Sequence, residues 1–187
     1  MSSELAKIPD PEARLLVAFV NTLDLERGED AVGTPAELAA WLAANLAELD
    51  PPERIDAAAH ERLLALRESL RALLRANNGG SASEDELRAL SEAVAQSSYR
   101  ATLDGGRLAL APAGPGLDPV VARLLLAVER LQASGAWPRL KACPAGDCEW
   151  AFFDTSRNRS RTWCSMEECG NRAKTRRYRQ RAASSIT

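Results

Sequence analysis

The chemistry available to this chain of 187 residues centres on its four cysteines. Cys143 and Cys148 have four residues between them, and Cys164 and Cys169 repeat that spacing after a gap of fifteen residues. Zn²⁺ takes four soft ligands in a tetrahedron, and two short cysteine loops joined by a longer one can bend toward one ion. The spacing predicts one structural zinc held by all four thiolates, with no open position for catalysis.

Two disulfides are the alternative use of these cysteines, and they persist in oxidising compartments. The longest apolar run near the amino terminus, residues 15–20, is too short to span a bilayer. Asp10 and Glu12 stand where a secretory signal would carry basic residues. We therefore expect neither a signal peptide nor a membrane anchor, place the protein in the cytoplasm, and favour metal binding over disulfides.

The sequence does not indicate an enzyme. The single histidine, His60, precedes Glu61 without the second histidine of a metalloprotease helix, and no nucleophile–base pair or phosphate loop is evident. Asn21, Thr22 and Asp24 interrupt an apolar helix and form a candidate pocket for a small-molecule effector. The end of that helix is an equally good explanation of the three polar residues.

Charge is divided unevenly along the chain. The formal net charge is −2, yet residues 139–187 hold eleven Lys and Arg against five Asp and Glu, a net charge of +6. The rest of the chain therefore carries a net charge of −8. An acidic body joined to a basic segment with all the cysteines indicates two modules, the second of which faces an anion such as nucleic acid.

Basic side chains of this segment are the candidates for nucleic-acid contact. They lie between the cysteine pairs and in a helix predicted after Cys164: Arg157, Arg159, Arg161, Arg172, Lys174, Arg176, Arg177 and Arg179. Arg172, Arg176 and Arg179 form one helical stripe, which we expect to dominate because Arg172 is next to the zinc-fixed end. A helix kept soluble by its charge is the alternative structural role. A protein-interaction adaptor that docks acidic partners is the alternative function.

Helices must position these residues. Apolar residues recur at helical spacing through most of residues 1–98. A capping side chain precedes proline at four places, and each pair predicts the start of a helix: Asp10, Thr34, Asp50 and Asp118.

Strands are expected in fewer places. Residues 99–111 alternate around a Gly-Gly turn, which predicts a β-hairpin. The expected fold class is mainly α with short β-hairpins (α+β). It comprises a helical domain over residues 1–136 and a small four-cysteine zinc module with a basic terminal helix over residues 137–187.

Four aromatic residues accompany the cysteines, namely Trp150, Phe152, Phe153 and Trp163. We favour the interpretation that they form the miniature core of the zinc module. The alternative is an exposed surface on which bases stack.

The sequence Cys169-Gly170-Asn171-Arg172 completes a pattern that resembles the CGNR zinc-finger family of bacterial proteins. The pattern covers residues 140–180 and includes Cys143-Pro144, Cys148, Trp150, Phe152, residues 154–158, Arg161 and residues 163–165. Residues 14–135 resemble, less fully, the ABATE domain that precedes this finger, mainly at residues 19–24 and 34–42.

This resemblance implies a stress-induced transcription regulator. Its C-terminal module would bind zinc and DNA. Its N-terminal domain would serve as a sensor or an oligomerisation domain, so that a small-molecule effector or a homodimer would act through that part of the chain.

Overall fold

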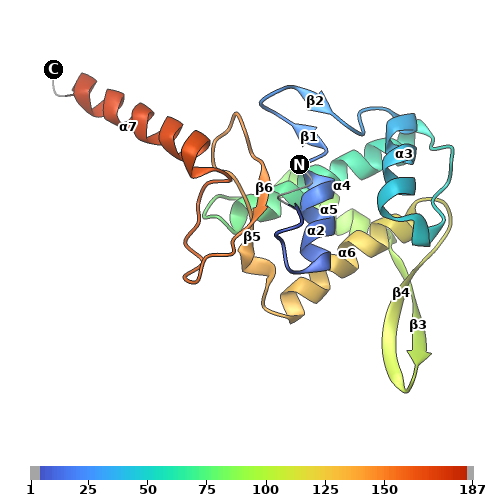
Figure 1. Cartoon of the computed structure of the whole chain (residues 1–187). Helices are drawn as coiled ribbons and strands as arrows, with labels where there is room; N and C mark the ends of the chain where they lie inside the picture. Colours follow the sequence, from blue (N-terminus) through green and yellow to red (C-terminus); the bar gives the residue numbers. More distant parts are fainter. Residues whose placement is uncertain (1–4, 185–187) are drawn as a thin grey trace.

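The computed structural model describes residues 5–184 (Figure 1). Five longer helices form the body within these residues: α2 (Pro11–Val20), α3 (Pro35–Asn45), α4 (Ala57–Ala76), α5 (Glu84–Gln96) and α6 (Asp118–Ala133). Helix α2 contacts both α4 and α6, and α5 lies along α4. The expected fold class, mainly helical with short antiparallel hairpins, is confirmed.

The core of the body is mainly aliphatic and lies between these helices. Phe19 of α2, Leu70 of α4 and Leu124 of α6 are almost completely buried in one cluster. Full burial of one such side chain contributes about 1.5–3 kcal/mol to stability. Phe19 also contacts Trp41 of α3, with 5.5 Å between the ring centroids. The apolar stripes seen in the sequence therefore face one another.

Several helix starts lie where the capping residues predict them. Asp10 accepts hydrogen bonds from the backbone N–H groups of Glu12 and Ala13 at the start of α2. Thr34 forms a complete capping box at the start of α3, and Ser83, which lies three residues before Glu86, forms another at the start of α5. These side chains satisfy backbone donors that have no partner within the helix.

The predicted start at Asp50 is wrong, and α6 starts at the predicted place without a cap from the Asp118 side chain. Asp50 ends the short 3₁₀ helix η1 (Ala47–Leu49) in a left-handed conformation, and α4 starts only after its N-cap Asp56. Leu117 is the N-cap of α6, while the Asp118 carboxylate accepts a hydrogen bond at 3.0 Å from Arg62 of α4. The Asp118 carboxylate therefore has a partner in α4 and makes no capping hydrogen bond.

Three antiparallel two-stranded sheets are described within residues 5–184: β1 (Leu23–Asp24) with β2 (Glu29–Asp30), β3 (Ser98–Asp104) with β4 (Arg107–Ala113), and β5 (Leu140–Ala142) with β6 (Ala151–Phe153). The β3–β4 hairpin occurs where the sequence predicts one. Gly105 and Gly106 form its turn with positive φ angles of 53° and 82°, which glycine adopts without strain. The β1–β2 pair interrupts a region that was expected to be helical.

The zinc module follows α6. The 3₁₀ helix η2 (Trp137–Arg139) leads into β5, and the π-helix η3 (Met166–Gly170) leads into the terminal helix α7 (Asn171–Ser184). Leu140 and Phe153 of β5 and β6 are buried in the same cluster as the body helices, while the cysteines form a second cluster. Figure 1 shows α7 and the β3–β4 hairpin at opposite ends of the molecule. The division between residues 136 and 137 stays a prediction.

Candidate metal centre and basic surface

The four cysteine sulfurs lie together at the base of α7. All four Sγ atoms are within 4.8 Å of one another, and the Cys148–Cys164 and Cys164–Cys169 Sγ distances are 3.5 and 3.6 Å. Four thiolates about 2.3 Å from one tetrahedral zinc would be separated by about 3.8 Å, so the cluster fits this ion. The chemistry of such a site is structural, because four protein ligands complete the coordination shell.

Short turns bring each pair of cysteines together. The Cys143 N–H donates to the carbonyl of Trp150, and the Cys148 N–H donates to the carbonyl of Ala145, which folds the first loop back on itself. In the second loop, Ser165 caps η3 by accepting a hydrogen bond from the Glu168 N–H at 3.2 Å.

Gly170 lies directly after the last cysteine and in close contact with Met166. A Cβ atom at Gly170 would lie 2.5 Å from the Met166 sulfur, so a larger residue there would displace the half-exposed Met166 side chain.

The close packing of the four thiols shifts the pKa values of Cys143, Cys148 and Cys164 in the way expected of a cation-binding site. Hydrogen bonds from Cys148 and Cys164 lower the pKa of Cys143 to about 2. The shared hydrogen bond with Cys143 in turn raises the pKa of Cys148 to about 12, and Cys143 raises that of Cys164 as well. Four neighbouring thiolates repel one another, and a divalent cation among them would remove that penalty and displace the thiol protons.

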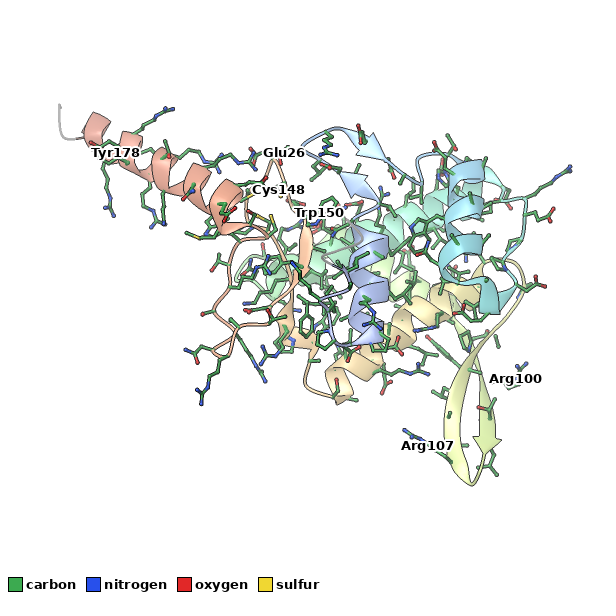
Figure 2. The ribbon with its side chains drawn as sticks, viewed as in Figure 1. Glu26, Arg100, Arg107, Cys148, Trp150 and Tyr178 are labelled. Carbon is green, nitrogen blue, oxygen red and sulfur yellow. The ribbon has the colours of Figure 1, made fainter. Side chains whose placement is uncertain are left out.

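Arg172 connects the cysteine cluster to the N-terminal body. Its Nη2 donates to the Cys169 sulfur at 3.1 Å, and its Nη1 forms an ion pair with Glu26 in the turn between β1 and β2. Glu26 and Cys169 raise the pKa of Arg172. Glu26 and the cluster around Cys148 and Trp150 lie near each other in Figure 2. The guanidinium of Arg172 therefore bonds to other residues of the protein.

The loop between β6 and Cys164 is fixed by a buried ion pair that the sequence did not reveal. Lys141 Nζ donates to the Asp154 carboxylate at 2.8 Å and to the carbonyls of Arg159 and Arg161 at 2.7 and 2.9 Å. Asp154 is fully buried and also accepts from the backbone and the hydroxyl of Ser156. Burial opposes ionisation of Asp154, but the hydrogen bonds from Lys141 and Ser156 outweigh it and lower the pKa to about 2.

Most of the predicted nucleic-acid residues are exposed. They extend from the loop after Asp154 and from α7: Arg157, Arg159, Lys174, Arg176, Arg177 and Arg179. Arg176 lies 4.0 Å from the Asp147 carboxylate. Arg161 instead turns inward, donates to the carbonyls of Trp163 and Cys164, and places its guanidinium 4.7 Å from the centre of the Phe152 ring.

The aromatic residues serve as core. Phe152 and Phe153 are buried, and Trp150 and Trp163 pack against the cysteine cluster. Trp150 and Trp163 therefore agree with the interpretation of a miniature core around the cysteines, whereas Phe153 belongs to the core of the body. The burial of Phe152 and Phe153 does not fit an exposed stacking surface.

The residues predicted to line an effector pocket make hydrogen bonds within the protein. Asn21 donates to the carbonyl of Ala151 at 2.9 Å and accepts from its N–H at 2.7 Å. Thr22 donates to the carbonyl of Phe19, and Asp24 accepts from two backbone N–H groups in its own turn. Neither of two surface hollows, one beside Leu66 and one beside Phe153, is lined by these three residues. Their role in effector binding stays a prediction.

Helix α4 supplies contacts that sequence reasoning missed. Arg67, Arg71 and Arg75 recur every four residues and therefore share one stripe of the helix. Arg71 is 1% exposed and donates to the carbonyls of Val20 and Glu149, and Arg75 forms an ion pair with the Glu149 carboxylate at 3.2 Å. The regular spacing of arginines on a core-facing stripe was the available signal.

The end of α4 continues this contact. Asn77 donates to the carbonyls of Trp137 and Leu140, and Asn78 donates to those of Ala142 and Thr162. The contacts of Asn77 and Asn78 hold the zinc module against the body.

His60 is a buried residue of α4, and its Nε2 lies 2.8 Å from the carbonyl oxygen of Val32.

A helical body that carries a four-cysteine cluster and a basic terminal helix defines a zinc-finger protein. The CGNR zinc finger model matches residues 139–182, and the ABATE model, described as a putative stress-induced transcription regulator, matches residues 13–141. Since the ABATE match covers more than half of the chain, the protein belongs to the ABATE family, and both resemblances are confirmed. No curated protein matches the chain. Within residues 5–184, no helix is both long enough and apolar enough to cross a membrane.

Proposed function

We propose that the protein is a cytoplasmic transcription regulator that binds DNA through α7 and the loop of residues 155–160. The ABATE domain would act as its sensor or oligomerisation domain. The zinc ion would hold the base of α7 through Cys143, Cys148, Cys164 and Cys169 and have no catalytic role, because its four positions would be filled.

The composition of α7 carries this proposal. Its 14 residues include six basic and no acidic residues, and it projects from the body in Figure 1. Like charges three or four positions apart on a helix repel by a few tenths of a kcal/mol per pair. Phosphates of a nucleic acid would relieve this repulsion, and arginine matches phosphate geometry with two parallel hydrogen bonds.

The contacts of α7 favour one side of the helix. Arg172 is held by Glu26 and Cys169, and Arg176 faces Asp147. Lys174 and Arg177 are exposed on the other side. We therefore propose that Lys174 and Arg177 contact phosphates before the stripe that begins with Arg172.

Salt-dependent binding tests the proposal. The zinc-loaded chain is titrated into fluorescent random-sequence duplex DNA, and into RNA of the same length, at several salt concentrations. Each phosphate contact contributes roughly 0.9 to the slope of log affinity against log salt. Replacing Lys174 and Arg177 by Ala should flatten that slope by about 2 while zinc content and helicity stay unchanged.

A matched control removes the same charge elsewhere. The double variant Arg54→Ala/Arg100→Ala alters two exposed basic residues of the body and should keep the wild-type slope. DNA binding without salt dependence, or equal slopes for both double variants, would contradict the proposed surface. Tighter binding to RNA than to DNA would mean that the ligand is RNA, and the proposed binding surface would stay the same.

One contact favours a second candidate function. The Glu26–Arg172 pair shows that a carboxylate can occupy the base of α7. An adaptor that docks acidic protein segments would use the same basic surface. An acidic peptide that binds more tightly than duplex DNA of equal charge would support the adaptor.

A further inference from the structure

The β3–β4 hairpin presents an apolar face to solvent. Leu103, Leu108 and Leu110 are 73%, 70% and 49% exposed, and Tyr99 is 38% exposed. The register pairs Leu103 with Leu108, Ala101 with Leu110 and Tyr99 with Pro112. Directly paired residues share a face of the ribbon, so these six residues form one continuous surface.

The charged residues of the hairpin lie on its other face. Arg100 pairs with Ala111, and Arg107 lies one position before Leu108 in β4, so both arginines alternate away from the leucines. Figure 2 shows Arg100 and Arg107 extending from the hairpin. The apolar face therefore contains no charged residue, and two copies of it could meet without bringing like charges together.

An uncovered hairpin of this kind is poorly stabilised in water. Its base contacts α6, and its tip projects beyond the body (Figure 1). A two-stranded ribbon needs a further layer on its hydrophobic face for stability. The exposed apolar patch is on the order of 400 Å², which is within the range that marks an interaction site on a monomer.

We infer that the apolar face of the β3–β4 hairpin binds the same face of a second copy of this chain. In a dimer with a two-fold axis, both subunits use the same surface, so each hairpin contacts the identical face of its partner. Two patches together bury roughly 800 Å², below the 1,200 Å² of a standard stable interface. The contact therefore belongs with weak, transient interfaces, and we expect a dissociation constant in the micromolar range.

This contact is separate from the zinc module. The hairpin lies at the end of the molecule opposite to α7 (Figure 1), so dimerisation leaves both basic helices uncovered. The inference does not depend on nucleic-acid binding, and the oligomeric state is measured without nucleic acid. If the protein fails to bind DNA, the inferred dimer is unaffected. If the protein stays monomeric, the proposed DNA-binding surface is unaffected.

Sedimentation equilibrium of the full, zinc-loaded chain tests the dimer. Wild type should show a monomer–dimer equilibrium in the micromolar range. Leu108→Glu should weaken dimerisation by about 100-fold. Each dimer loses two apolar side chains from the contact and gains two negative charges, which repel each other. Leu103→Gln, on the neighbouring strand, should weaken it by about tenfold.

Ala109→Glu is the matched control. Ala109 is the next residue of β4, is exposed, and faces away from the leucines, so the same new side chain should leave the dimer unchanged. Circular dichroism verifies that all variants keep their helices. A wild type that stays monomeric well above the micromolar range would overturn the inference, as would equal dimerisation of Leu108→Glu and Ala109→Glu.

Discussion

A single buried ion pair shapes the loop that carries Arg157 and Arg159. Lys141 and Asp154 are both buried, and each completes its hydrogen bonds with backbone groups of that loop. A buried pair of this kind adds little net stability, but the loss of one partner leaves an unpaired charge inside the protein. The conformation of the loop that carries the two exposed arginines therefore depends on two buried residues.

Asp154→Asn should lower the free energy of unfolding by about 3 kcal/mol at neutral pH, because Lys141 would be left buried without its counter-charge. Urea unfolding followed by circular dichroism measures this change. Asp147→Asn is the control, since the Asp147 side chain is 53% exposed and its contact with Arg176 is long. The control should change stability by less than about 0.5 kcal/mol. Equal effects would show that Asp154 is not a structural anchor.

The same residue predicts a dependence on pH. The pKa of Asp154 falls from its ordinary value of 3.8 to about 2 on folding. The resulting stabilisation of about 2 kcal/mol is complete above pH 3.8 and is lost as the pH falls toward 2. The stability difference between wild type and Asp154→Asn should therefore narrow below pH 3.8. A difference that stays constant down to pH 2 would contradict the lowered pKa.

At the scale of elements, local signals predicted more than distant ones. The capping boxes of Thr34 and Ser83 join residues three positions apart, so the sequence contains both partners. The four cysteines were identifiable because metal coordination fixes their type and spacing. By contrast, the two backbone carbonyls that Arg71 of α4 binds are 51 and 78 residues away, and no local rule connects them. The hydrogen bonds between Asn21 and the backbone of Ala151, 130 residues away, could not be predicted from the sequence for the same reason.

Replacing the guanidinium of Arg71 should weaken the contact between α4 and the zinc module. Arg71→Lys keeps the charge but cannot reach both the Val20 and Glu149 carbonyls, and it should cost about 2 kcal/mol in unfolding free energy. Arg62→Lys on the same helix is the control, because the Arg62 side chain is 49% exposed. We expect a change below about 1 kcal/mol for that variant. Urea unfolding of both variants is the measurement, and equal losses would show that the Arg71 contacts do not stabilise the fold.

At the scale of the whole molecule, two clusters divide the interior. The body cluster includes Leu140 and Phe153, whereas the cysteine cluster is small and depends on the metal for most of its cohesion. Zinc removal should therefore act on the two parts differently.

Chelation should release one zinc per chain and raise hydrogen exchange in residues 143–150 and 154–171, while α2, α4, α6 and the β5–β6 strands keep their protection. Hydrogen exchange measured by mass spectrometry, together with metal analysis, tests this. A buffer of the same ionic strength without chelator is the control. Uniform loss of protection across α4 and α6 would show that the body cannot fold without the metal.

The attachment of α7 has a mechanical consequence. The helix has 14 residues and is therefore about 21 Å long, and its side-chain anchors at Arg172 and Arg176 lie in its first two turns. If α7 moved as a rigid rod about this anchored end, a rotation of about 10° would displace its far end by about 4 Å, close to the axial rise of about 3.4 Å per nucleotide of one DNA strand. A small movement of the β1–β2 turn, which carries Glu26, would then shift the far end of the basic helix by about one nucleotide along the axis of a bound duplex.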